Sequence, residues 1–427
     1  MRIVVIVLGL ALLARDAQAQ AAPPLTLAEL YRRIEPTSPR LAAARARSDA
    51  ARARIGPASR WPDPAIQLAL MNRSLPRLGL SDPLGMTQLQ IMQMVPVAGK
   101  TGLAVRAARA GAEAEAERTR EMAQDVRADA AMRFFDLYQA DATLGLMREG
   151  RRLLGEALRA GEAMYASGST PQAVVLRAQV ELARMDEAVL RMEGMRATMA
   201  SALNALAELP LDAPVGTPTL PAFPAAPPPV DSLEALALAR RPMLAAGALD
   251  AAQRDLLARR TAREIWPDLT LGVIYGQRPM PDGGTDRMAS FMLGFTLPLT
   301  PGSRQRQMTS EARAMHAEAV ADLAAMRLET RTRIGALAAE LTRTAATRRH
   351  YQTILLPELE AATGSALSGY RAGQVDLMTL LESQMGLIAA RQELVRLDAE
   401  TGKAWAELEM LTTMTFLAAA SADGATR

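Results

Sequence analysis

The chain of 427 residues carries 49 basic and 46 acidic side chains, no cysteine, and only 4% aromatic against 49% hydrophobic residues. Without cysteine it has no disulfides, thiolate metal sites or cysteine nucleophiles, and it lacks the basic clusters with interleaved aromatics that nucleic-acid binding requires. So few aromatic rings exclude a ring-filled globular core, and we expect small side chains to pack closely on long helices.

The N-terminus has the pattern of a secretory signal peptide. Arg2 precedes an uncharged run over 3–14, and the small-residue sequence Ala17-Gln18-Ala19 follows. This apolar run is shorter than the roughly 20 residues of a membrane-spanning helix. We therefore expect residues 1–19 to be a signal peptide that is cleaved after Ala19, with Ala21 and Ala22 as alternative cleavage positions that also satisfy the small-residue rule.

A first structural repeat is predicted over residues 25–209. It begins with helix, and two runs of alternating hydrophobicity then predict a β-hairpin over 65–97, with strands of the ~10-residue length that tilted membrane strands require. A long helix over 100–164 contains no proline, and about 65 helical residues reach roughly 100 Å. A return helix over 170–208 has an apolar heptad seam typical of a coiled coil. The seam residues are Val175, Leu182, Val189 and Leu203.

A proline-rich segment and a second repeat follow. Residues 210–230 hold eight prolines, which favours an extended linker. The second repeat is predicted over 231–415, again with helix, hairpin, long helix and return helix. The last three elements span 269–299, 304–369 and 375–412. Residues 416–427 are predicted to form a disordered tail.

The two halves are related by an internal duplication at a shift of about 205 residues. The sequence Trp-Pro-Asp at Trp61 recurs at Trp266, and Tyr-x-x-Gly at Tyr165 recurs at Tyr370. Four strands cannot close a barrel, and open sheet edges are costly in lipid because their backbone groups lack partners. Several copies of the chain must therefore share one barrel.

This organisation resembles the TolC family of outer-membrane efflux proteins. The resemblance rests on the duplicated order of elements, on Tyr-x-x-Gly at each helical turn, and on Pro-x-x-Gly-Lys after the second strand, and it covers residues 25 to 415. It implies a mainly α protein with a membrane β-barrel. Three protomers would each contribute four strands to a twelve-stranded barrel in outer-membrane lipid, above a coiled-coil tunnel in the periplasm. The implied partners are a periplasmic adaptor (membrane fusion protein) and an inner-membrane transporter of the RND type.

The resemblance also assigns roles to single residues. The transitions from barrel to helix are expected at Pro96, Gly99, Lys100, Pro298 and Gly302. The periplasmic turns, where an adaptor would dock, contain Tyr165, Gly168, Tyr370 and Gly373. The glycines there would accept left-handed backbone angles.

A gate is expected just beyond the second turn. Its candidates are Tyr370, Asp376 and Glu382, and Glu382 is our choice for a carboxylate ring that attracts cations. Val174 and Val375 stand where some relatives carry charged links, which leaves closure by packing as the alternative to closure by salt bridges.

No group of residues predicts an enzyme, a cofactor or a metal centre. The run Ala98 to Thr101 imitates the end of a phosphate-binding loop, but Met94 stands where the first glycine of that motif belongs. The two histidines, His316 and His350, are about 50 Å apart on one helix at the usual helical rise and cannot share a metal. We expect the carboxylates to be solvated partners of helical arginines.

Methionines near the hairpins leave the cargo open. Thioethers are soft ligands that suit Cu(I) or Ag(I), which favours heavy-metal cations, whereas methionine that only fills gaps or faces lipid would equally suit an exit path for small organic compounds. The methionines concerned are Met71, Met86, Met92, Met94, Met288 and Met292. The alternative class is a periplasmic coiled-coil adaptor, which would show one helical hairpin rather than two.

Overall fold

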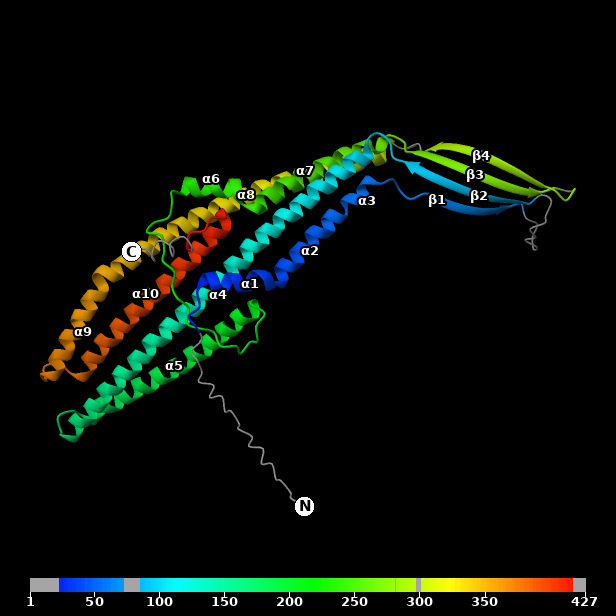
Figure 1. Ribbon diagram of the computed structural model, residues 1–427. Helices are drawn as coiled ribbons and strands as arrows, with labels where there is room; N and C mark the ends of the chain where they lie inside the picture. Colours follow the sequence, from blue (N-terminus) through cyan, green and yellow to red (C-terminus); the bar gives the residue numbers. More distant parts are fainter. Residues whose placement is uncertain (1–22, 73–84, 281, 297–300, 418–427) are drawn as a thin grey trace, which may run out of the picture.

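The computed structural model describes residues 23–72, 85–280, 282–296 and 301–417, and it is strongly elongated (Figure 1). A sheet occupies one end, long helices run from it, and two helical turns lie at the other end. The first repeat contains α1 (Leu27–Thr37), α2 (Pro39–Ala53), α3 (Ile55–Ser59), β1 (Ala65–Met71), β2 (Met86–Val95), α4 (Lys100–Ala166) and α5 (Gln172–Leu206). The second contains α6 (Val230–Arg240), α7 (Pro242–Ala262), η1 (Arg263–Ile265), β3 (Leu269–Pro279), β4 (Thr285–Phe295), η2 (Pro301–Gln305), α8 (Arg306–His350), η3 (Tyr351–Leu355), α9 (Leu356–Arg371) and α10 (Leu377–Thr412). The predicted signal peptide, residues 1–19, lies outside the described residues.

The two long helices differ. Helix α4 runs for 67 residues without interruption, and it reaches roughly 100 Å at the usual helical rise. The helix expected over 304–369 is instead divided by the π-helical turn η3, which ends two residues before Pro357. Proline lacks the N–H of a helical hydrogen bond and its ring clashes with the preceding turn, so a wider turn accommodates it. None of the helices in the described ranges combines the length and apolarity of a membrane span.

The four strands form one antiparallel sheet in the order β1-β2-β3-β4. Its register places Ile66, Ile91, Val273 and Phe291 in one row across the four strands. These residues and the apolar residues at every second position along each strand form an exposed apolar face. That face consists of Ile66, Leu68, Leu70, Leu89, Ile91, Leu271, Val273, Tyr275, Phe291, Leu293 and Phe295. The opposite face carries glutamine, glycine and methionine, and we call it the methionine face. No described strand pairs with the outer edges of β1 and β4.

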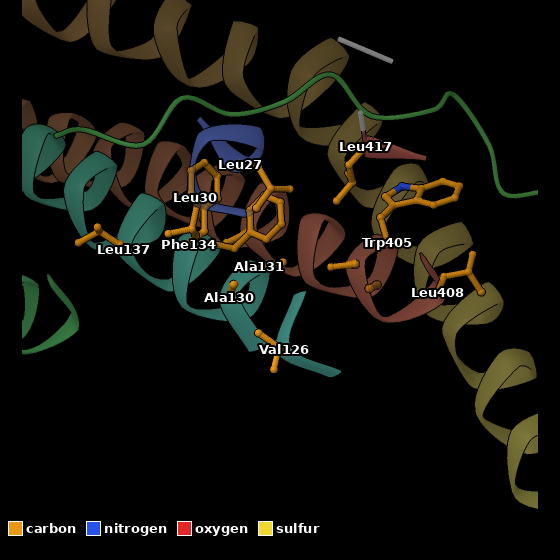
Figure 2. Packing of buried hydrophobic residues seen from close by; sticks show 14 of the residues in the cluster. Leu27, Leu30, Val126, Ala130, Ala131, Phe134, Leu137, Trp405, Leu408 and Leu417 are labelled. Carbon is orange, nitrogen blue, oxygen red and sulfur yellow. The ribbon is translucent and has the colours of Figure 1, made fainter. Parts of the chain in front are cut away.

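The main core lies where both repeats meet, with side chains from α1, α4 and α10 among its members (Figure 2). Phe134 of α4 and Trp405 of α10 are fully buried there among leucine and alanine. Small residues allow this packing: a Cβ on Gly402 would lie 2.2 Å from the ring of Phe135.

The prediction of a disordered tail over 416–427 is wrong for its first two residues. Phe416 packs on Trp405 with ring centroids 5.1 Å apart, and Leu417 is buried. The Glu409 carboxylate accepts hydrogen bonds from the backbone N–H groups of Phe416 and Leu417. Residues 418–427 lie outside the described residues.

Candidate functional site

Lys100 joins the two repeats at the point where strands become helices. It is 5% exposed, and its ammonium group donates to the Trp266 carbonyl at 2.8 Å and to the Asp268 carboxylate at 2.9 Å. Asp268 also accepts from the backbone N–H of Val97 at 3.1 Å, and Glu264 lies 3.3 Å from the ammonium nitrogen. These contacts fix the Trp-Pro-Asp sequence of the second repeat to the Pro-x-x-Gly-Lys sequence of the first repeat. We call this arrangement the junction clamp.

The other junction residues of the sequence analysis are only partly placed. Gly99 caps α4 with a φ of 70°, a left-handed conformation that favours glycine, and Pro96 follows β2. Arg263 donates to the Ala98 carbonyl at 2.7 Å and closes the turn. In the second repeat Gly302 lies within the turn η2, and Pro298 falls outside the described residues.

The two helical turns at the far end have the same construction. Gly168 and Gly373 have φ values of 76° and 69°, and each N–H donates to the carbonyl of the tyrosine three residues earlier, at 2.9 and 3.0 Å. A Cβ on either glycine would meet no atom within 4 Å, so glycine is required by backbone conformation and not by space. Tyr165 is exposed at its turn.

Tyr370 brings the two turns together. Its hydroxyl donates to the Met164 sulfur at 3.2 Å, which links α9 to the end of α4, and burial raises the pKa of its phenol. An apolar cluster continues this contact along α4, α5 and α10. Its buried members are Leu154, Ala178, Met185, Leu377 and Leu381. Val174 packs against the cluster, so apolar packing holds the two helical hairpins together here.

The carboxylates proposed for a gate have different surroundings. Asp376 caps α10, accepting from the Thr379 N–H at 2.9 Å and from the Thr379 hydroxyl, and these hydrogen bonds lower the pKa of its carboxyl. Glu382 is exposed on α10, beside the buried Leu381. Asp376 therefore stabilises the first turn of α10, whereas Glu382 is exposed to solvent.

The contacts of two charged residues could not be predicted from the sequence, because their partners are distant in the chain. Arg391 of α10 lies 3.6 Å from Glu149 of α4 and 3.1 Å from Glu360 of α9. Glu121, 1% exposed, accepts from Arg241 at 2.9 Å and from the Met243 N–H at 3.1 Å. Burial raises the pKa of Glu121 against the lowering effect of Arg241. The expectation of solvated carboxylates is wrong for this residue.

A family profile described as outer membrane efflux protein matches residues 30–208 and 233–413, one match for each repeat. The chain belongs to this family. Its members are outer-membrane channels with a helical part in the periplasm, and they are not enzymes. The family assignment places the sheet end of the present efflux protein in the outer membrane and decides against the adaptor alternative.

Solved structures support the fold of this efflux protein. The outer membrane protein VceC from Vibrio cholerae is similar with a TM-score of 0.77 and 19% identity, over 91% of this chain and 96% of that chain. A membrane protein from Pseudomonas aeruginosa gives 0.78 and 18%, over 90% and 92%. The open state of the MtrE channel from Neisseria gonorrhoeae gives 0.74 and 14%, over 90% and 88%. The predicted fold class, mainly α with barrel strands, is confirmed. Among curated protein sequences no significant match was found.

Proposed function

We propose that this protein is the outer-membrane channel subunit of a tripartite efflux pump, in which three copies form a closed passage from the periplasm to the exterior. A periplasmic adaptor and an inner-membrane transporter of the RND type would complete the pump. The cargo would be heavy-metal cations or small organic toxic compounds, and the channel would supply passage without catalysis.

The apolar face of the sheet is the observation that carries this proposal. Phe291 on it is 88% exposed and Leu68 is 70% exposed. Contact of such apolar side chains with water is unfavourable, whereas contact with lipid is favourable. The unpaired edges of β1 and β4 require partners in a membrane. In a closed barrel of three copies, β4 of one protomer would pair with β1 of the next, and the backbone groups at both edges would form hydrogen bonds.

The helical end supports contact with an adaptor. The turns at Gly168 and Gly373 lie side by side at the tip farthest from the sheet, and most of their residues are exposed (Figure 1). We assign adaptor docking to these turns, with Tyr165 and Tyr370. The gate would be the contact between the two hairpins at Tyr370, with the ring of Glu382 carboxylates as its ion filter and Asp376 as a further candidate.

One arginine substitution on each face of the sheet tests the membrane assignment. Leu271→Arg places a charge on the apolar face and should reduce barrel insertion, because arginine costs about 2 to 4 kcal/mol near the bilayer midplane. The readout is the heat-modifiable trimer band from outer-membrane fractions.

Gln90→Arg is the matched control, since Gln90 lies in the same sheet on the methionine face. A charge there would meet the water of the lumen and leave the trimer band unchanged. Equal insertion of both variants would contradict the assignment of the two faces.

A further inference from the structure

All methionines of the described strands lie on one face of the sheet. The register places Met71 beside Met86, and Met92 and Met292 on either side of Gly272. Met94 and Met288 belong to the same face by alternation, and the apolar face has no methionine. Methionine that served only as lipid-facing apolar surface would be found among the leucines and phenylalanines opposite. In the proposed barrel, with the apolar face toward lipid, these methionines would face the lumen.

Gly272 brings two thioether side chains to one point. A Cβ built on this buried glycine would lie 3.1 Å from Cε of Met292 and 3.6 Å from Cγ of Met92. These two residues stand on β4 and β2, one strand to each side, so both side chains lean over the glycine from opposite directions. A side chain at this position would crowd both methionines, so the glycine leaves them room on either side of it.

We propose that Met92 and Met292 form a two-thioether site for a soft monovalent cation, Cu(I) or Ag(I), on the wall of the passage. This inference rests on the proposed channel function, because only a closed barrel makes the methionine face a lumen. The site would occur once in each protomer, and the remaining thioethers would extend soft contacts along the same wall.

The chemistry of the site favours this class of ion. Thioether sulfur is a soft, neutral ligand that selects Cu(I) over magnesium or calcium, which require oxygen ligands. The neighbouring side chains on this face are uncharged, with Gln90 and Ile274 in the adjacent row. Among the described residues no group of three histidine or acidic side chains could hold a metal ion. Two neutral ligands bind weakly, and weak binding is what a passage needs if the ion is to leave again.

Met86, on the same face, differs from Met92 and Met292 because its sulfur is already engaged. It accepts a hydrogen bond from the Gln88 amide at 2.8 Å, which occupies one of its lone pairs. No described residue donates to the sulfurs of Met92 or Met292. Their lone pairs are thus free for a cation.

Silver binding to the purified trimer tests the site. The probe is Ag(I) nitrate in chloride-free buffer, and the measurement is equilibrium dialysis with metal analysis of the detergent-solubilised full chain. We expect one Ag(I) per protomer at the tightest site. Met92→Leu combined with Met292→Leu keeps the packed volume but removes both ligands. Even the loss of an outer-shell partner commonly costs about 10-fold to 100-fold in affinity, so binding should weaken by at least about tenfold.

Two further variants separate ligation from packing. Gly272→Ala leaves both methionines in the chain but pushes them apart, and it should weaken Ag(I) binding as well. Met195→Leu with Met308→Leu removes two exposed methionines on α5 and α8, and it should leave the tightest site intact.

The trimer band on the gel distinguishes the possible failures. If the wild-type chain forms no trimer, the channel proposal fails, and the site on the wall of the passage fails with it because it requires the closed barrel. If trimers form and the Met92/Met292 double variant binds Ag(I) as the wild type does, the two-thioether site is overturned while the channel proposal stands.

Discussion

At the scale of single residues, the packing of Gly402 against Phe135 fixes how closely α10 can approach α4. A Cβ at this position would overlap the aromatic ring, at 2.2 to 2.6 Å from three of its carbons. The ring is fully buried and cannot swing into solvent. Gly402→Ala should therefore destabilise the fold by about 1 to 3 kcal/mol, the usual cost of overpacking. Thermal unfolding followed by circular dichroism measures the effect.

Gly386→Ala, on the same helix, is the matched control. A Cβ there would meet no atom of the protomer within 4 Å. Replacing a helical glycine by alanine should then stabilise the fold by about 0.5 to 1 kcal/mol, because alanine loses less backbone entropy. Destabilisation of equal size by both variants would show that helix approach at Gly402 is not the limiting contact.

At the scale of elements, Arg391 connects three helices near the contact between the hairpins. It pairs with Glu149 of α4 and Glu360 of α9 while standing on α10. A gate that opens by separating the hairpins must break the pair with Glu149. The pair with Glu360 lies within one hairpin and survives opening, so only the partly exposed pair with Glu149 counts, at about 0.5 to 1 kcal/mol. Arg391→Ala should therefore raise the open fraction of the channel about twofold to fivefold. Single-channel recording in planar bilayers checks this.

The same recordings contain their controls. Among the described residues Arg184 pairs with Glu181 of its own helix alone, so Arg184→Ala should leave the open fraction unchanged. Glu382→Gln should change cation preference without changing the open fraction, since Glu382 makes no ion pair with any described residue. An unaltered open fraction in Arg391→Ala would place closure in the apolar cluster alone.

The sequence predicted the elements better than their contacts. Alternation in 65–71 and 269–279 was enough to predict those strands, and the weaker alternation in 86–95 places Met92 on the face opposite Leu89 and Ile91. The break before Pro357 follows from a proline that the helix prediction over 304–369 did not use. The junction clamp could not be predicted, because Lys100 and Asp268 are brought together only by the pairing of β2 with β3. The same holds for Arg391 and Glu121, whose partners depend on which helices become neighbours.

At the scale of the whole molecule, the internal duplication suggests how protomers join. Lys100 follows β2, and its partner Asp268 precedes β3, the strand that pairs with β2. In a closed ring of three copies, β4 of one protomer would pair with β1 of the next. Arg304 follows β4, and Asp63, the counterpart of Asp268, precedes β1. Both are exposed, and neither forms an ion pair with a described residue of its own chain. A second junction clamp, between protomers, would give each of them its partner.

Cysteine crosslinking tests this intersubunit clamp, and the chain offers a clean background because it contains no cysteine. Asp63→Cys combined with Arg304→Cys should be joined by a short thiol-specific crosslinker into species of two and three protomers on a denaturing gel. Lys100→Cys combined with Asp268→Cys is the matched control, since the same reagent should join these residues within one protomer and give no ladder. Each single-cysteine variant should remain monomeric, because three-fold symmetry keeps identical positions apart around the barrel. If the control pair crosslinks and the Asp63/Arg304 pair does not, protomers do not meet β4 to β1 in the register that the duplication implies.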